Sequence, residues 1–261
     1  MPDILGHTVH QVTVGAGAPA AMIHCVLARH DTLLPLANAI GGQATLFDMP
    51  GHGQSADWDG NQDYQGLVVA SVAACCNGPT HLIGHSFGAT AALRLAIERP
   101  DLVNRLTLIE PVYFAAAKGT PEHGAHAKDF RPFVGAMLQG DEERAAEVFN
   151  DLWGATPWEK IHARLRKYLV DRIHLVVAGA AAIEEDADGS TAADRPGNLD
   201  IPATLIRGED TQPVIKAIHA RLAERLPNAT AHAIAGAAHM VPLSHVDQVA
   251  AIIHAADPET G

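Results

Sequence analysis

The sequence predicts an α/β fold, in which a mostly parallel sheet is covered by helices on both faces. Short apolar runs alternate with longer amphipathic stretches along most of the chain, as in repeated strand–helix–strand units. Most of the apolar runs lack polar alternation, which is typical of strands buried on both faces. The composition is 48% hydrophobic and 18% charged, which is enough apolar side chain for a sizeable core.

The individual elements follow from this alternation. The predicted strands are Ala20–Leu27, Ala44–Asp48, His81–Gly84, Arg105–Ile109, Ala203–Arg207 and Ala229–Ala235. The predicted helices between and after them are Leu33–Ile40, Gln62–Cys76, Ala89–Arg99, Pro213–Leu226 and Ser244–Ala256. Pro100 and Pro227 each follow one of these helices closely and cannot extend it.

The alternation is interrupted between Val112 and about Asp200. This segment contains no convincing buried strand, but it has helical periodicity over Asp141–Trp153 and Trp158–Ala178, followed by a polar stretch, Glu184–Asn198. The strand pattern resumes immediately afterwards. We therefore predict a core made of residues 1–111 and 201–261, with a helical cap inserted at residues 112–200.

Charge and composition exclude several functional classes. The formal net charge is -12, and no basic run offsets it locally, so we expect no nucleic-acid partner. The first residues lack a cationic, apolar leader, and no run of eighteen apolar residues occurs, so we expect neither secretion nor a membrane span. The three cysteines have no CxxC spacing, which favours a cytoplasmic protein without disulfides or a zinc cage.

The chemistry is predicted to centre on Gly84-His85-Ser86-Phe87-Gly88. This G-x-S-x-G pattern follows an apolar strand and opens a helix, the context that an exposed nucleophilic serine requires. The two glycines are needed because strand and helix nearly touch at such a turn. Phe87 would offer its backbone N–H to a developing oxyanion at the start of the helix.

A base and an acid are needed beside Ser86. His239 follows a predicted strand and a small-residue loop late in the chain, where a histidine can reach the nucleophile; His245 is the weaker alternative. Glu110 and Asp210 both follow strands and are the two candidates for the acid that orients the histidine. We favour Glu110, because a carboxylate that ends a buried strand requires a partner.

Further residues are expected around this centre. Cys25 or Val26, after the first long strand, would supply the second oxyanion N–H. Aromatic side chains in or beside the cap are candidates either to line the substrate pocket or to form the core of the cap: Tyr113, Phe130, Phe133, Trp153 and Trp158.

Taken together, four segments resemble the α/β-hydrolase superfamily, in its branch of small single-chain serine esterases and related hydrolases. They are the strand ending in His24, the D-x-P-G-H-G-x-S loop Asp48–Ser55, the turn Gly84–Gly88, and Gly236–Met240. The resemblance covers roughly Gly15–Tyr113 and Ile201–Ala256. It implies a sheet of about eight strands, a helical cap between the sixth and seventh, and Ser-acid-His catalysis without a cofactor.

The chain departs from this family at two positions. Cys25 stands where family members usually have glycine, and Thr211 stands where the acid after the seventh strand usually lies, so that Asp210 is one residue early. Some relatives carry the acid after the sixth strand instead, which corresponds to Glu110. Both acids therefore stay open at this point.

The expected activity is hydrolysis of a carboxylic ester or similar small acyl substrate. The same residues could act on thioesters or lactones, cleave a carbon–carbon bond or support perhydrolysis, because reaction choice on this fold lies in the pocket. A non-catalytic binding protein is the alternative from another class. We expect no metal, since the sixteen histidines include no H-E-x-x-H. The sequence makes no prediction of oligomeric state.

Overall fold

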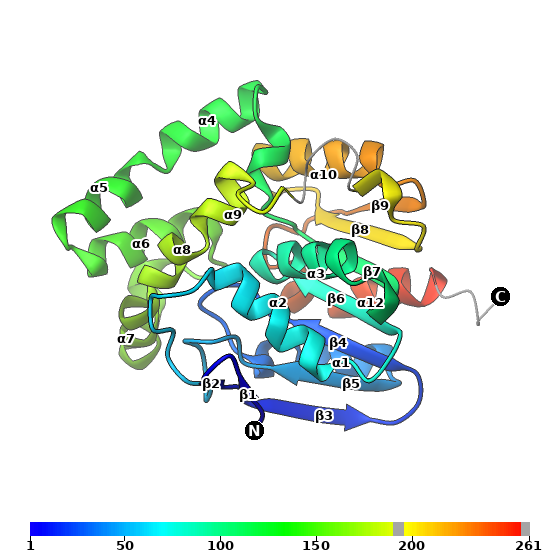
Figure 1. Cartoon of the computed structure of the whole chain (residues 1–261). Helices are drawn as coiled ribbons and strands as arrows, with labels where there is room; N and C mark the ends of the chain where they lie inside the picture. Colours follow the sequence, from blue (N-terminus) through cyan, green and yellow to red (C-terminus); the bar gives the residue numbers. More distant parts are fainter. Residues whose placement is uncertain (190–195, 257–261) are drawn as a thin grey trace.

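A computed structural model describes residues 1–189 and 196–256. Its centre is a sheet whose strand order is β3-β5-β4-β6-β7-β8-β9 (Figure 1). In chain order the strands are β3 (Gln11–Gly15), β4 (Pro19–Ile23), β5 (Gln43–Phe47), β6 (Thr80–His85), β7 (Val103–Ile109), β8 (Ala203–Gly208) and β9 (Ala229–Ile234). Neighbouring strands are parallel except at the edge, where β3 pairs antiparallel with β5. The predicted α/β class is therefore confirmed.

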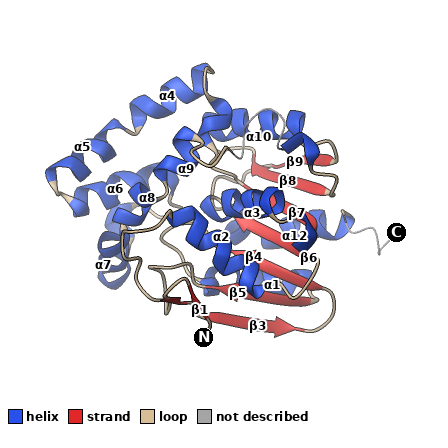
Figure 2. Cartoon of the chain, in the orientation of Figure 1, coloured by secondary structure: helices blue, strands red, loops and turns tan. Residues whose placement is uncertain are grey.

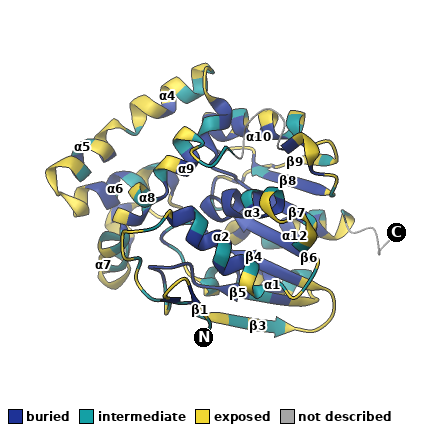
Figure 3. Ribbon diagram, viewed as in Figure 1, coloured by how far each residue is buried: buried dark blue, intermediate teal, exposed yellow. Residues whose placement is uncertain are grey.

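Helices cover both faces of the sheet, and alternate strand residues face each side. Met22, Ile83 and Ile206 pack with α1 (Leu34–Ile40) and α12 (Val246–Ala255). Ile23 and Leu82 belong to the cluster on the opposite face. That face is covered by α2 (Tyr64–Cys75), α3 (Phe87–Glu98) and α10 (Pro213–Arg225). Because both faces are covered, the central strands are almost entirely buried (Figure 3).

A block of helices is inserted between β7 and β8, beside the carboxyl ends of the parallel strands (Figure 2). It contains α4 (Pro121–Asp129), α5 (Arg131–Gln139), α6 (Glu142–Trp153), α7 (Ala163–Arg172), α8 (His174–Ala178) and α9 (Ala180–Glu185). Thr120 and Asp141 accept hydrogen bonds from the first turns of α4 and α6, which explains where these helices begin. The block has its own apolar cluster, which includes Phe133, Trp158 and Ile173. We call this block the cap.

Two details differ from the sequence prediction. In the described part of the chain the main sheet has seven strands and not eight, and five of them precede the cap. The N-terminal residues instead form a separate small sheet of β1 (Asp3–Ile4) and β2 (His7–Thr8). The polar stretch Glu184–Asn198 lies partly outside the described residues. None of the described helices is both long enough and apolar enough to cross a membrane.

The remaining short elements connect the main ones. The predicted last helix, Ser244–Ala256, corresponds to α12, and a separate short helix, α11 (Val241–Ser244), precedes it. Single helical turns of the 3-10 type are η1 (His30–Leu33), η2 (Pro100–Leu102), η3 (Phe114–Ala117), η4 (Trp158–Lys160) and η5 (Pro196–Asn198). The loop 235–240 lies between β9 and α11.

Candidate active site

Ser86 lies on a sharp turn between β6 and α3. Its φ of 56° and ψ of -119° are outside the regions that non-glycine residues favour. A Cβ at Gly84 would collide with the backbone of Gly88 and Ala89, and one at Gly88 with the carbonyl oxygens of Ile23 and His24. Strand, turn and helix are therefore in direct backbone contact, which is the steric reason for both glycines.

His239 lies in the loop after β9 and reaches back to Ser86. Its Nε2 is 3.0 Å from the Ser86 Oγ, and both side chains are almost completely buried. The backbone oxygen of His239 accepts a hydrogen bond of 2.9 Å from Nε2 of His85, the residue before the serine. Burial, reinforced by His239, lowers the pKa of His85 to about 3. A neutral His85 therefore fixes the loop that carries His239.

Glu110 follows β7 directly and completes a chain of hydrogen bonds. Its Oε2 is 3.0 Å from Nδ1 of His239. The carboxylate is fully buried and also accepts hydrogen bonds from the N–H of Gly208, at 2.6 Å, and from the hydroxyl of Thr211, at 2.5 Å. A carboxylate can only accept, so Nδ1 of His239 donates and Nε2 is free to accept from the Ser86 hydroxyl.

Asp210, the other predicted acid, points elsewhere. The residue is exposed, and within the described residues its carboxylate makes no hydrogen bond to His239. Its backbone N–H is bound by the carbonyl oxygen of Ala237. Thr211, the next residue, faces inward and uses its hydroxyl to hold Glu110. The geometry therefore favours Glu110 over Asp210, and it gives the threonine at the usual acid position a supporting contact.

Backbone N–H groups beside Ser86 are the candidates to bind an oxyanion. In the described part of the chain, no protein acceptor pairs with the N–H of Phe87, or with those of Cys25 and Val26, the two alternatives for the second donor. All three residues line the cavity that contains Ser86. Gly88 lies close to the carbonyl oxygens of Ile23 and His24, which brings the two segments together.

Cys25 does not distort this loop. The left-handed residue of the segment is Leu27, with a φ of 63°, whereas Cys25 has no positive φ. A side chain at position 25 is thus compatible with the backbone, although family members usually have glycine there. Burial raises the pKa of the Cys25 thiol to about 12, so its sulfur stays protonated and is a poor nucleophile.

Two buried histidines hold the turn that contains Val26 and Leu27. Nδ1 of His24 donates to the carbonyl oxygen of Cys25, at 2.7 Å, and Nε2 accepts from the N–H of Met49. Nε2 of His52 accepts from the N–H of Leu27, at 2.9 Å. Burial lowers the pKa of His24 to about 4 and that of His52 well below its usual value. Both rings are therefore neutral and able to accept.

Tyr168 connects the cap to the same turn. Its hydroxyl donates to the carbonyl oxygen of Ala28, at 3.0 Å, and accepts from the N–H of Gly53, at 3.2 Å. The guanidinium of Arg172 stacks 4.1 Å above its ring. This residue was not predicted from the sequence, because the local pattern around position 168 does not indicate a contact with residues more than a hundred positions away.

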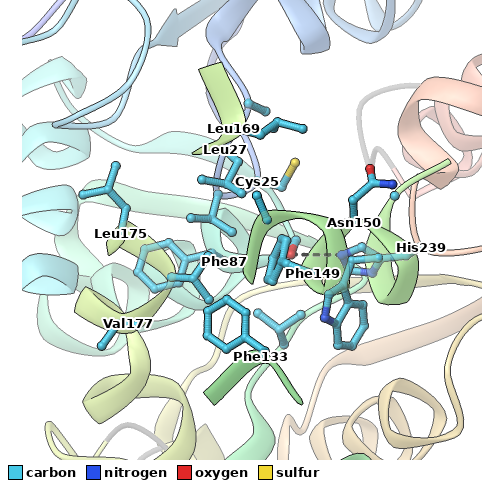
Figure 4. A pocket seen from close by; sticks show the side chains of 18 of the residues that line it. Cys25, Leu27, Phe87, Phe133, Phe149, Asn150, Leu169, Leu175, Val177 and His239 are labelled. Atoms are coloured by element: carbon cyan, nitrogen blue, oxygen red, sulfur yellow. Dashed lines mark hydrogen bonds between the residues drawn. The ribbon is translucent and has the colours of Figure 1, made fainter. Parts of the chain in front are cut away.

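A cavity of about 1290 Å³ opens above Ser86 and His239, between the core and the cap (Figure 4). The predicted residues Phe130, Phe133 and Trp153 line it. The Trp153 ring lies 4.8 Å from the His239 ring. The site is therefore covered by cap side chains.

Two of the predicted lining residues lie elsewhere. Trp158 is buried in the apolar cluster of the cap. Tyr113 is completely buried, and its hydroxyl donates to the carboxylates of Asp186 and Asp188, at 3.3 and 3.0 Å. Neither side chain borders the cavity, because each is used for packing or for attachment of the cap.

One group of side chains has the spacing of metal ligands. Ligand atoms of His10, His30 and Asp48 lie within 4.8 Å of one another among the described residues. However, the Asp48 carboxylate already accepts hydrogen bonds from the backbone and ring of His30 and from the N–H of Gln54. Burial alone would raise its pKa, but these donors outweigh it and lower the pKa. The group is explained as a hydrogen-bonded support of the loop after β5.

Several known proteins with similar sequences or structures are named as hydrolases or esterases. Residues 12–252 match the family model described as the alpha/beta hydrolase family. The (E)-2-((N-methylformamido)methylene)succinate hydrolase of Acinetobacter baylyi is 26% identical over 93% of this chain and 91% of its own. The pimeloyl-[acyl-carrier protein] methyl ester esterase of Methylococcus capsulatus is 29% identical over 81% and 83%. An esterase structure from Exiguobacterium antarcticum superposes with a TM-score of 0.77 at 16% identity, over 97% of both chains.

Proposed function

Because this chain belongs to the alpha/beta hydrolase family, we propose that it is a serine hydrolase that cleaves carboxylic esters or similar acyl compounds. The observation that carries the proposal is the continuous hydrogen-bonded chain from Ser86 through His239 to Glu110, with both contacts to the imidazole at 3.0 Å. It lies at the base of a large cavity, next to backbone N–H groups that have no acceptor among the described residues. Each part is needed for acyl transfer through a covalent intermediate.

In the first half of the reaction, the Ser86 oxygen attacks the substrate carbonyl while Nε2 of His239 removes the hydroxyl proton. Negative charge develops on the carbonyl oxygen, where the N–H of Phe87 and that of Cys25 or Val26 stabilise it. Glu110 stabilises the imidazolium and keeps Nδ1 protonated. When the bond to the leaving group breaks, His239 transfers its proton to that group, and an acyl ester of Ser86 remains.

In the second half, water attacks the acyl-enzyme. His239 again removes the proton of the nucleophile, and the same N–H groups hold the oxyanion. Breakdown of the second tetrahedral species returns the proton to Ser86 and releases the carboxylic acid. No cofactor or metal is needed, since every proton moves between the substrate, water and His239.

The names of similar proteins support hydrolysis but point to different substrates. One is a hydrolase of an amidomethylene succinate and another an esterase of a methyl ester on an acyl-carrier protein. We propose ester hydrolysis, because an oxygen nucleophile beside a histidine and two N–H donors is suited to acyl transfer.

The test is labelling with a fluorophosphonate, which phosphonylates only activated serines. Intact-mass measurement should show one adduct on the wild-type protein and none on Ser86→Ala. With p-nitrophenyl esters, Ser86→Ala should lower kcat by roughly 10⁶-fold, to the level left by binding and the oxyanion donors. A folded wild type that forms no adduct and hydrolyses no ester would contradict the proposal and favour a binding protein.

A further inference from the structure

The cavity walls beside Ser86 are strongly apolar. Figure 4 shows Leu175, Val177 and Phe87 on the side of the pocket away from His239, with Phe133 and Phe149 between the two sides in this view. Asn150 lies near His239 instead. An acyl chain bonded to Ser86 would therefore extend along hydrocarbon. Binding becomes more favourable with each methylene of the chain that the wall removes from water.

Charged groups are scarce in the same walls. Among the described residues that line the cavity there is no arginine, and only Lys160 and Glu184 carry a charge apart from the histidines. Lys160 is exposed to solvent at the edge, and Glu184 is also partly exposed. A second carboxylate on the substrate would thus find no buried Lys or Arg among the described lining residues to offset its desolvation, which is costly.

The apolar surface continues out of the cavity. The structure describes seven large hydrophobic residues that are strongly exposed, and five of them line the mouth of this cavity, from 39% exposed at Leu243 to 85% at Leu138. The other three of the five are Val134, Leu165 and Val177. Scattered exposed apolar residues are ordinary, but the concentration of five of them along one cavity favours a binding surface there. We call these five residues the rim.

From these observations we propose that the site selects uncharged substrates with a long, unbranched apolar acyl chain, whose distal end lies across the rim. The inference rests on the proposed serine hydrolase function and adds the substrate class to it. The volume of about 1290 Å³ exceeds that of most small-molecule pockets, which leaves room for such a chain together with its leaving group.

The primary test measures kcat/KM for p-nitrophenyl esters from acetyl to octanoyl. We expect a rise of at least about tenfold across the series, because each buried methylene contributes. The octanoyl ester is then compared with the mono-p-nitrophenyl ester of octanedioic acid, in which a carboxylate replaces the terminal methyl group. We expect about 100-fold lower kcat/KM for the charged ester.

Single-residue variants test whether the rim is the part of the site that selects the acyl chain. Leu138→Ser and Leu165→Ser alter exposed side chains on the rim, so both proteins should fold, whereas Leu5→Ser alters an exposed leucine that does not line the cavity. In the rim variants the ratio of kcat/KM for the dodecanoyl ester to kcat/KM for the acetyl ester should fall about threefold. Leu5→Ser should leave this ratio unchanged.

Three results would overturn the inference. Equal or faster hydrolysis of the octanedioic ester would show that a carboxylate is recognised. Falling kcat/KM with chain length would show that the apolar wall is not used. A dimer in light scattering that Leu138→Ser dissociates, without a chain-length effect, would assign the rim to a second copy of the chain. In all three cases labelling of Ser86 and hydrolysis of the acetyl ester would persist, which distinguishes them from failure of the proposed function, in which both would be absent.

Discussion

The two walls of the site differ in how their polar groups are used. On the core side, the carboxylate of Glu110 has three donors, and His24 and His52 each bind a backbone N–H of a neighbouring loop. On the cap side, the wall is largely aliphatic and aromatic, and many of its residues are exposed (Figure 3). Directional hydrogen bonds fix positions to a fraction of an ångström, whereas apolar contacts tolerate variation.

We infer from this difference that the two walls have different roles. The core side has the geometry that bond cleavage requires, since a nucleophile, base and oxyanion donors must be placed accurately. The cap side has the properties that decide which acyl group is bound. Substitutions on the core side should therefore alter kcat for every substrate, and substitutions on the cap side should alter the ranking of substrates.

The largest expected effect separates the two acids of the core. Glu110→Gln removes the negative charge that stabilises protonated His239 and replaces one accepting oxygen by an amide donor, which favours the wrong tautomer of the ring, so it should lower kcat by about 10⁴-fold with little change in KM. Asp210→Asn is the matched control, since Asp210 is an exposed carboxylate only a few residues from the Glu110 partners. It should retain kcat within about twofold. Equal losses in the two variants would show that neither carboxylate has the assigned role.

A second effect concerns the acid stability of the core side. His24, His52 and His85 all have lowered pKa values because of burial. The unfolded chain therefore binds more protons than the folded one between about pH 4 and pH 6.5, and stability falls as pH is lowered through this window. With two to three protons involved, the free energy of unfolding should drop by about 3 kcal/mol per pH unit.

Urea denaturation between pH 7 and pH 5 measures this slope. Asp48 has a lowered pKa as well. Its contribution to the free energy of unfolding is lost only when the pH falls below the ordinary pKa of an aspartate, which is outside the pH window measured here. His245→Gln changes a half-buried histidine and should leave the slope unaltered. A free energy of unfolding that does not depend on pH would contradict the neutral state of the three rings.

The smallest effect tests the contact between the two walls. Tyr168→Phe removes the hydroxyl that binds Ala28 and Gly53, so the turn carrying the Val26 N–H loses one support. We expect kcat to fall about fivefold for both acetyl and octanoyl esters, with KM nearly unchanged. Tyr113→Phe, which removes a cap contact far from this turn, should leave kcat unaltered. A change in KM without a change in kcat would contradict this prediction and indicate that Tyr168 contributes only to packing.

The centre of the core could be predicted from the sequence because its constraints are local. Gly84 and Gly88 flank Ser86 in the chain, and the apolar runs before Glu110 and His239 placed both at strand ends. The choice between Glu110 and Asp210 could not be completed, since it depends on which side chain faces inward in the loop after β8. Thr211 and Gly208 decide this by donating to Glu110.

The cap and the edges were harder to predict. The short β3 strand was missed, although Val12 and Val14 alternate with polar residues, because it is an exposed edge with a weak hydrophobic pattern. Tyr113 and Trp158 are aromatic like Phe133 and Trp153, but tertiary packing turns the first two away from the cavity. Tyr168 and His52 act through contacts distant in sequence, which local periodicity does not record.

The most direct test of the account is rapid-quench mass spectrometry with an equimolar mixture of p-nitrophenyl acetate and octanoate. We predict that the acyl group is found on the peptide that contains Ser86, with octanoyl in large excess over acetyl. No peptide of the Ser86→Ala variant should carry an acyl group. Acylation at another residue, or acetyl as the main adduct on Ser86, would contradict it.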